Sequence, residues 1–290
     1  MTEKKFIEVC FAGLPNAGKS SLINRLVGDK ISIVSPKAQT TRDVIRGIFV
    51  EDNTQVVLVD TPGIFIPQKK RPLERKIIKN AWYGVEETEI VCIIIDSVCG
   101  ITDAVKTTIN DIIKKKKRII FVLNKVDLVK KEKLLLLASE LEKIYPSFEK
   151  IFMVSAKNGD NVDLLKKYLI TIAPRAEWMF NDDEISDAPM KFMAAEITRE
   201  KLFLNLREDL PYSIDVTTDA WEELNNGSIK INQSIIVLKE SQKAIVVGKN
   251  GKMLKNISIS ARTDMESLFG RKVHLFLFVK VENGWIGEKF

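Results

Sequence analysis

The sequence is poor in the residues that build disulfide frameworks and histidine-centred sites. Its 290 residues include three cysteines and one histidine. Cys10, Cys92 and Cys99 are odd in number, widely spaced and lack the Cys-x-x-Cys pattern, which argues against a disulfide framework. Two of them lie in strand-like apolar blocks and are interpreted as buried thiols in a reducing cytosol. His274 lies at the start of a predicted strand, so no catalytic or metal-binding role is expected for it.

Long hydrophobic runs are also missing. A membrane-spanning helix needs about 18 consecutive apolar residues, whereas the longest apolar blocks, Ile90–Ile95 and Leu134–Ala138, have the length of a strand and of a helix segment. The first five residues lead straight into a strand and lack the apolar region of a signal peptide. We therefore expect a cytoplasmic protein. We also expect a monomer. A length of 290 residues favours two domains.

One glycine-rich segment has the spacing of a phosphate-binding loop. Residues Gly13–Ser20 match G-x-x-x-x-G-K-S, between a strand-like block at Phe6–Ala12 and a helical pattern at Ser21–Val27. In this context, backbone N–H groups converge on phosphate oxygens and the start of the helix adds partial positive charge. The lysine can reach the β- and γ-phosphates, and the final serine hydroxyl can ligate Mg²⁺. The predicted phosphate ligands in this segment are Gly13, Asn16, Ala17, Gly18, Lys19, Ser20 and Ser21.

A second motif, Asp60-Thr-Pro-Gly63, follows the apolar strand Gln55–Val59. The aspartate can hold the hydration shell of Mg²⁺, and the amide of Gly63 can meet a γ-phosphate. Asp60 and Ser20 are therefore predicted metal-site residues, and Gly63 is a predicted phosphate ligand.

Two more motifs follow apolar strands further along the chain, Asn124-Lys-Val-Asp127 and Ser155-Ala-Lys157. The Asp127 carboxylate can accept hydrogen bonds from both N1–H and the exocyclic amine of guanine, a pair that adenine does not offer. The four motifs, each after a strand and in this order, predict a GTP-binding and GTP-hydrolysing protein. The predicted guanine-binding residues are Asn124, Lys125, Asp127, Ser155, Ala156 and Lys157.

The alternation of strands and helices predicts an α/β domain with a mostly parallel sheet. The short link at Glu51–Thr54 predicts one antiparallel edge pair, between Val44–Val50 and the strand at Gln55. Residues 181–189 have neither helical nor strand periodicity. We therefore predict a GTPase domain at residues 1–175, a linker at 176–190 and a second domain at 191–290.

The second domain is expected to be an α+β RNA-binding domain of the KH type. A helix at Phe192–Leu204, strands at Tyr212–Val216 and Ile229–Leu238, and a short strand at Ala244–Val247 precede a G-x-x-G loop. A helix through Ile257, a further helix at Ala261–Leu268 and a strand at Val273–Val279 follow it. In KH domains a G-x-x-G loop clamps the nucleic-acid backbone, because two glycines leave room for close approach.

Charge supports this interpretation. The chain has a net charge of +6 and a pI near 9.0, which favours a polyanionic partner. Residues 241–263 contain five basic residues and no acidic one. The predicted RNA-binding residues are Lys243, Gly248, Lys249, Asn250, Gly251, Lys252, Lys255 and Arg262. A second basic run, Lys114–Arg118, precedes a core strand, and it fits either a solvated helix end or a phosphate contact.

These motifs together resemble the Era family of bacterial ribosome-assembly GTPases, over residues 6–285. Further matching segments are Lys37–Arg42, Arg199–Leu202, Leu210–Tyr212 and Gly284-Trp285. The resemblance implies a type II-like KH domain, GTP or GDP and Mg²⁺ as ligands, and binding to the small ribosomal subunit at the 3′ end of its ribosomal RNA. It also implies a role in assembly of that subunit and peripheral association with the inner face of the cell membrane.

The resemblance identifies Ser35–Arg42 as the first switch segment, in which Thr41 or its neighbour Thr40 closes on Mg²⁺ and the γ-phosphate. Ile64 follows the second motif where signalling GTPases have a water-positioning glutamine, so slow intrinsic hydrolysis is expected. Asn16 fits GTPases that recruit K⁺, although asparagine also tolerates tight loops. The leading hypothesis is a GTPase switch that controls RNA binding; the alternative is an RNA-binding assembly factor whose nucleotide is mainly structural.

Overall fold

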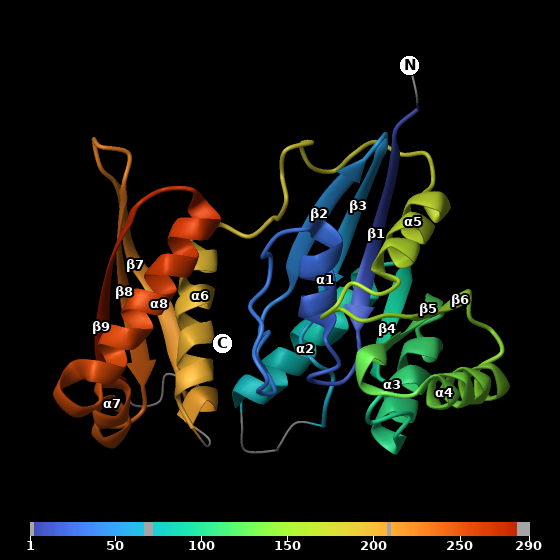
Figure 1. Ribbon diagram of the computed structural model, residues 1–290, viewed down its shortest axis with the longest axis horizontal. Helices are drawn as coiled ribbons and strands as arrows, with labels where there is room; N and C mark the ends of the chain where they lie inside the picture. Colours follow the sequence, from blue (N-terminus) through green and yellow to red (C-terminus); the bar gives the residue numbers. More distant parts are fainter. Residues whose placement is uncertain (1–2, 67–71, 208–209, 283–290) are drawn as a thin grey trace. The chain divides into compact units, whose positions relative to one another are not determined.

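The computed structural model describes residues 3–66, 72–207 and 210–282 (Figure 1). The chain divides into two compact units. One consists of Met1–Val34 with Thr41–Asp187, and the other of Ser35–Thr40 with Ala188–Phe290. The matching pair Gly284-Trp285 lies outside the described residues.

The first unit is built on a six-stranded sheet with the strand order β2-β3-β1-β4-β5-β6. All its pairings are parallel except β2 with β3, which confirms the predicted antiparallel edge pair. The strands are β1 (Lys5–Ala12), β2 (Ile45–Glu51), β3 (Thr54–Asp60), β4 (Ile90–Asp96), β5 (Arg118–Asn124) and β6 (Lys150–Met153). Parallel strands buried on both faces are continuously apolar. In β4, for example, Cys92 and Ile94 enter one core cluster while Val91 and Ile93 enter the other.

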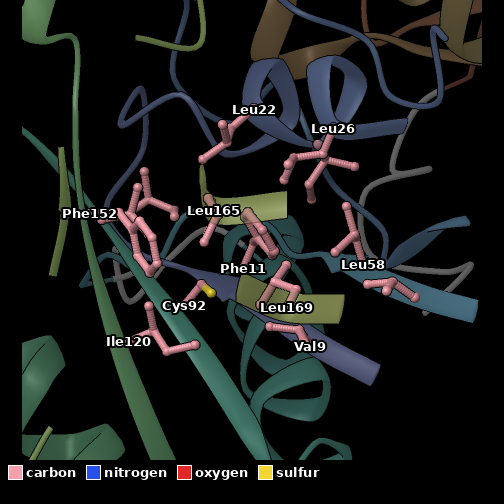
Figure 2. Close-up of a cluster of buried hydrophobic side chains, with 14 of the residues drawn as sticks. Val9, Phe11, Leu22, Leu26, Leu58, Cys92, Ile120, Phe152, Leu165 and Leu169 are labelled. Atoms are coloured by element: carbon pink, nitrogen blue, oxygen red, sulfur yellow. The ribbon is translucent and has the colours of Figure 1, made fainter. Parts of the chain in front are cut away.

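Helices cover both faces of this sheet. On one face lie α1 (Lys19–Val27) and α5 (Val162–Ile172), and on the other α2 (Pro72–Glu87), α3 (Asp103–Lys114) and α4 (Lys131–Ile144). Figure 2 shows how Leu22 and Leu26 of α1, and Leu165 and Leu169 of α5, converge on Phe11 of β1. Each pair is four residues apart, so both members project from one side of their helix. This packing fixes the start of α1 at the end of β1, where the glycine-rich loop lies.

The second unit has a three-stranded sheet, β7-β8-β9, in which β8 is antiparallel to β7 and parallel to β9. The predicted α+β KH architecture is confirmed. Its strands are β7 (Asp215–Glu223), β8 (Ile229–Val237) and β9 (Val273–Val281), and its helices are α6 (Met190–Asn205), α7 (Glu240–Val247) and α8 (Lys252–Phe269). Short 3-10 turns occupy Val126–Leu128, Leu210–Ser213 and Lys249–Gly251.

Three sequence predictions for this unit are wrong. The apolar run at Ala244–Val247 is the last turn of α7 rather than a strand. Only Val246 is buried there while Ile245 is exposed, which is the one-sided burial of a short helix. The helix expected at Ala261–Leu268 is continuous with the preceding one, because α8 buries Ile257, Ala261 and Met265 along one face. The strand expected at Tyr212–Val216 begins at Asp215, after a 3-10 turn.

The cysteine interpretation is confirmed for two residues. Cys10 and Cys92 are buried in β1 and β4, whereas Cys99 is exposed. Burial raises the pKa of the Cys10 thiol to about 12, so it is inert packing material at neutral pH.

Candidate functional site

The glycine-rich loop joins β1 to the N-terminus of α1. Gly18 is the residue before the first turn of α1 and adopts φ 94°, a left-handed conformation. A Cβ atom at this position would lie 2.2 Å from the side-chain nitrogen of Asn124, so both the backbone and the space require glycine. The Lys19 ammonium donates hydrogen bonds to the carbonyls of Gly13 and Leu14, at 3.2 and 3.0 Å. Burial lowers the pKa of Lys19 to about 8, opposed by the negative charge of Asp60, and a phosphate placed at the loop would favour its charged form.

The side chains of Ser20, Thr41 and Asp60 offer oxygen ligands for a divalent cation beside this loop. Asp60, the last residue of β3, is fully buried, and neither carboxylate oxygen has a hydrogen-bond partner in the part of the chain that the structure describes. Burial raises its pKa, opposed by the hydroxyls of Ser20 and Ser32 and by the positive charge of Lys19. A buried carboxylate without partners is costly unless a cation or donor accompanies it. Hard oxygen donors of this kind are the ligands that Mg²⁺ prefers, so these residues fit the predicted metal.

The two candidate switch threonines lie in different surroundings. The hydroxyl of Thr41 lies 3.0 Å from that of Ser20, at the start of α1. The hydroxyl of Thr40 instead donates to the carbonyl of Lys37 at 2.7 Å and lies 2.6 Å from the hydroxyl of Ser35. The structure therefore brings Thr41, and not Thr40, to the predicted metal ligand.

Ile64 is held by both its backbone and its side chain. Its amide donates to the Gly13 carbonyl at 3.0 Å. Its side chain is only 6% exposed and belongs to the core cluster with Ala81 and Val85 of α2. It therefore cannot orient an attacking water.

The predicted guanine-binding residues converge around Asn124, the last residue of β5. Its side-chain nitrogen donates to the carbonyl of Ala17 in the phosphate loop at 2.8 Å, and its side-chain oxygen accepts from the amide of Ala156 at 3.0 Å. Asn124 thus ties the phosphate loop to the Ser155–Lys157 segment. The carboxylate of Asp127 accepts a hydrogen bond from the Ser155 hydroxyl at 2.6 Å. That bond occupies one carboxylate oxygen and fixes the orientation of the group.

Two positioning residues were not predicted. Asp96, the last residue of β4, forms an ion pair with Lys125 at 2.7 Å. Arg25 of α1 donates to the carbonyls of Ala156 and Lys157, at 3.3 and 2.6 Å. Asp96 could have been found, because it ends a buried parallel strand as Asp60 does. Arg25 carries no such signal, since its helix is distant in sequence from the loop that it holds.

In the second unit, the G-x-x-G loop joins α7 to α8. Asn250 and Gly251 adopt left-handed φ values of 53° and 74°, and Gly251 precedes the first turn of α8. Nothing lies within 4 Å of a Cβ atom built on Gly251, whereas one built on Gly248 would lie 2.6 Å from the Cβ of Met253. The two glycines therefore differ, because Gly248 is required by packing and Gly251 faces open space.

The predicted basic residues gather beside this loop. Lys249, Lys252, Lys255 and Arg262 are exposed and Lys243 is half-buried. At 3.6 residues per turn, the three that belong to α8 share one face of that helix. Two exposed apolar residues that sequence reasoning missed, Ile245 and Ile259, belong to the two helices that flank the loop. An isoleucine on a lysine-rich helix face is the signal that could have found Ile259.

Comparisons with known families match both units. The family model for 50S ribosome-binding GTPases matches residues 8–125, and the KH domain model matches residues 209–286. The chain is 46% identical over 278 residues to GTPase Era of Afipia carboxidovorans, covering 96% of this chain and 89% of the relative. It is 47% identical over 277 residues to GTPase Era of Brucella suis, covering 96% and 88%.

Two solved structures are similar over nearly the whole chain. One is Era in complex with MgGDPNP and nucleotides 1506–1542 of 16S ribosomal RNA, with a TM-score of 0.94, 36% identity and coverage of 99% of this chain and 96% of that one. The other is a variant of Aquifex aeolicus Era bound to GDP and AlF4⁻, with a TM-score of 0.94, 36% identity and coverage of 98% and 96%. Within the described residues, every helix is too short or too polar to cross a lipid bilayer.

Proposed function

The chain belongs to the GTPase Era family, and from this premise we propose that it couples GTP hydrolysis to binding of the 3′ end of 16S ribosomal RNA during assembly of the small ribosomal subunit. The similar Era structure was solved with MgGDPNP and nucleotides 1506–1542 of that RNA. The nucleotide part of the proposal is supported by the hydrogen-bond bridge at Asn124, which joins the predicted phosphate loop to the predicted guanine-binding segment. A filter-binding assay with that RNA fragment, with and without a GTP analogue, tests the coupling.

Within this function the phosphate loop holds the nucleotide. Gly13, Asn16 to Ser21 and Gly63 would supply backbone amides, Lys19 would add its ammonium, and Asp127 would select guanine. Ser20, Thr41 and Asp60 would hold Mg²⁺, directly or through its bound water, and Mg²⁺ would neutralise charge on the phosphates. The alternative, in which nucleotide is mainly structural, is supported only by the buried side chain of Ile64. Single-turnover hydrolysis with and without RNA separates the two hypotheses.

Replacing Thr41 is expected to harm Mg²⁺-dependent GTP binding more than replacing Thr40. Thr41→Ala removes the hydroxyl next to Ser20, and we expect affinity for a GTP analogue in Mg²⁺ to fall at least tenfold, roughly 1.4 kcal/mol. Thr41→Ser keeps the hydroxyl and is the matched control. Thr40→Ala loses only bonds within its own loop, so its effect should stay within threefold. The reverse order of effects in a nucleotide-binding titration would assign the switch role to Thr40.

Asn16 is proposed to hold K⁺ against the phosphates. The residue is exposed and adopts φ 62°, with no side-chain hydrogen bond among the described residues. Exchanging Na⁺ for K⁺ should speed hydrolysis at least tenfold in the wild type, because the bound K⁺ would neutralise charge on the phosphates. The ionic strength is kept constant so that screening does not change. Asn16→Ala should lose that difference and still bind GDP. Equal wild-type rates in the two salts would leave Asn16 with only its role in the turn.

Peripheral association with the cell membrane is a separate proposal, supported by the family resemblance alone. Flotation of the full chain with anionic vesicles tests it.

A further inference from the structure

A groove with a volume of about 600 Å³ lies between α2 and α3, in the first unit. It is formed by the C-terminal halves of both helices, from Lys79 to Glu86 and from Asp111 to Lys115. The helices return from the end of one parallel strand to the start of the next, so their C-termini lie where the strands begin. The phosphate and guanine loops follow the other ends of β1, β3 and β5. The groove therefore lies at the opposite end of the strands from the proposed nucleotide site.

Two aromatic side chains line this groove, Trp82 and Tyr83. Tyr83 is 54% exposed and Trp82 is half-buried. The Lys115 ammonium lies 5.8 Å from the centroid of the Trp82 ring, within cation–π range. The groove thus offers an exposed ring at Tyr83 and an ammonium held at the neighbouring Trp82. Such a ring can stack on a planar base, because every base has a stackable face, and the ammonium can meet the phosphate.

The charged side chains that line the groove have a small net positive charge. Its lining contains three lysines and two carboxylates. Lys114 is paired with Asp111 at 2.8 Å, and Lys115 is paired with Glu86. Lys79 has no acidic partner among the residues that the structure describes. Lys116 and Lys117 follow directly in the chain and extend the positive rim.

We propose that this groove binds an unpaired nucleotide of ribosomal RNA, with its base against Tyr83 and Trp82 and its phosphate against Lys79 and Lys115. The inference rests on the proposed RNA-binding function and adds a second contact site, on the GTPase unit. An acidic peptide matches the groove less well, because it would leave the aromatic rings unused. The carboxylates that line the groove can accept hydrogen bonds from a base amine. This gives the basic run at Lys114–Arg118 a role beyond that of a solvated helix end.

The test uses the full chain and the RNA fragment of nucleotides 1506–1542, labelled for fluorescence anisotropy. Tyr83→Ala should weaken binding at least fivefold, as expected for loss of one stacked base, while Tyr83→Phe keeps the ring and should bind within twofold of the wild type. Lys79→Gln with Lys115→Gln should weaken binding. The plot of log affinity against log salt should also become less steep, by about 1.4, for the loss of two phosphate contacts on a single strand. The matched control is Lys131→Gln with Lys143→Gln, two exposed lysines of α4, which should change nothing. GDP affinity should be constant in all variants and reports an intact fold.

Photocrosslinking of 4-thiouridine RNA should label a peptide that contains residues 79–86. If the Tyr83→Ala variant binds the RNA as tightly as the wild type, the groove is not an RNA contact, and the KH loop remains as the proposed contact. A loss confined to the lysine variants would reduce the groove to a charged patch and refute base stacking. Displacement of the RNA by AMP or by polyglutamate, without a crosslink, would assign the groove to free nucleotides or to an acidic protein. No RNA binding by the wild type would remove the proposed function together with this inference.

Discussion

Asp127→Asn is expected to convert the protein from a GTP-binding to an XTP-binding enzyme. The carboxylate of Asp127 is predicted to accept from the two N–H donors of guanine, whereas an amide offers one donor and one acceptor, which match xanthine. Each hydrogen bond to a charged group contributes about 1.5–3 kcal/mol. The amide keeps one acceptor for N1–H and places its own donor against the exocyclic amine, so the loss of one such bond, about 1.5–3 kcal/mol, reduces GTP affinity roughly ten- to a hundredfold. Competition of GTP and XTP against a fluorescent nucleotide measures the change.

The structure provides a matched control for this substitution. Asp96 is also an aspartate at the end of a parallel strand, but it pairs with Lys125 and is not predicted to touch the base. Asp96→Asn should weaken binding of both nucleotides without creating a preference for XTP. The Ser155 hydroxyl, which donates to Asp127, remains in both variants. An Asp127→Asn protein that still prefers GTP would show that the Asn124–Asp127 segment does not select the base.

The second large effect is expected at the G-x-x-G loop. Gly251→Asp places a carboxylate in open space at the start of α8, where the RNA backbone is proposed to lie. Like-charge repulsion should lower affinity for the 16S fragment at least tenfold, or roughly 1.4 kcal/mol. Gly251→Asn is nearly isosteric, uncharged and equally tolerant of left-handed φ, so the difference between the two variants measures charge alone. Both variants place a side chain on the same left-handed residue, so backbone strain is common to them and a loss confined to the aspartate variant would not reflect unfolding.

Gly248 is the less informative position for this test. A side chain there would collide with Met253, so packing and RNA contact would change together. Nucleotide affinity should be unchanged by Gly251→Asp, because every predicted nucleotide ligand precedes residue 158. If the aspartate and asparagine variants bind the RNA equally well, the phosphate chain does not pass this loop, and the neighbouring lysines form a solvated face.

The sequence by itself determined the architecture of the first unit and the identity of its nucleotide motifs. Phosphate and base recognition depend on short segments with fixed spacing, such as Gly13–Ser20 and Asn124–Asp127, and each follows an apolar strand. In a parallel sheet such segments must gather at the carboxyl ends of the strands. The antiparallel pair of β2 and β3 was predictable for a similar reason, since a short link permits no other pairing.

The tertiary structure decided what local pattern leaves open. Thr40 and Thr41 are adjacent and chemically alike, and only the distance from Thr41 to Ser20 separates them. The run at Ala244–Val247 is apolar throughout, and its helical state became clear only from which side chain is buried. The bonds of Asn124 to Ala17 and of Arg25 to Lys157 join segments more than a hundred residues apart. Periodicity describes one segment at a time, whereas these choices depend on which distant surfaces pack together.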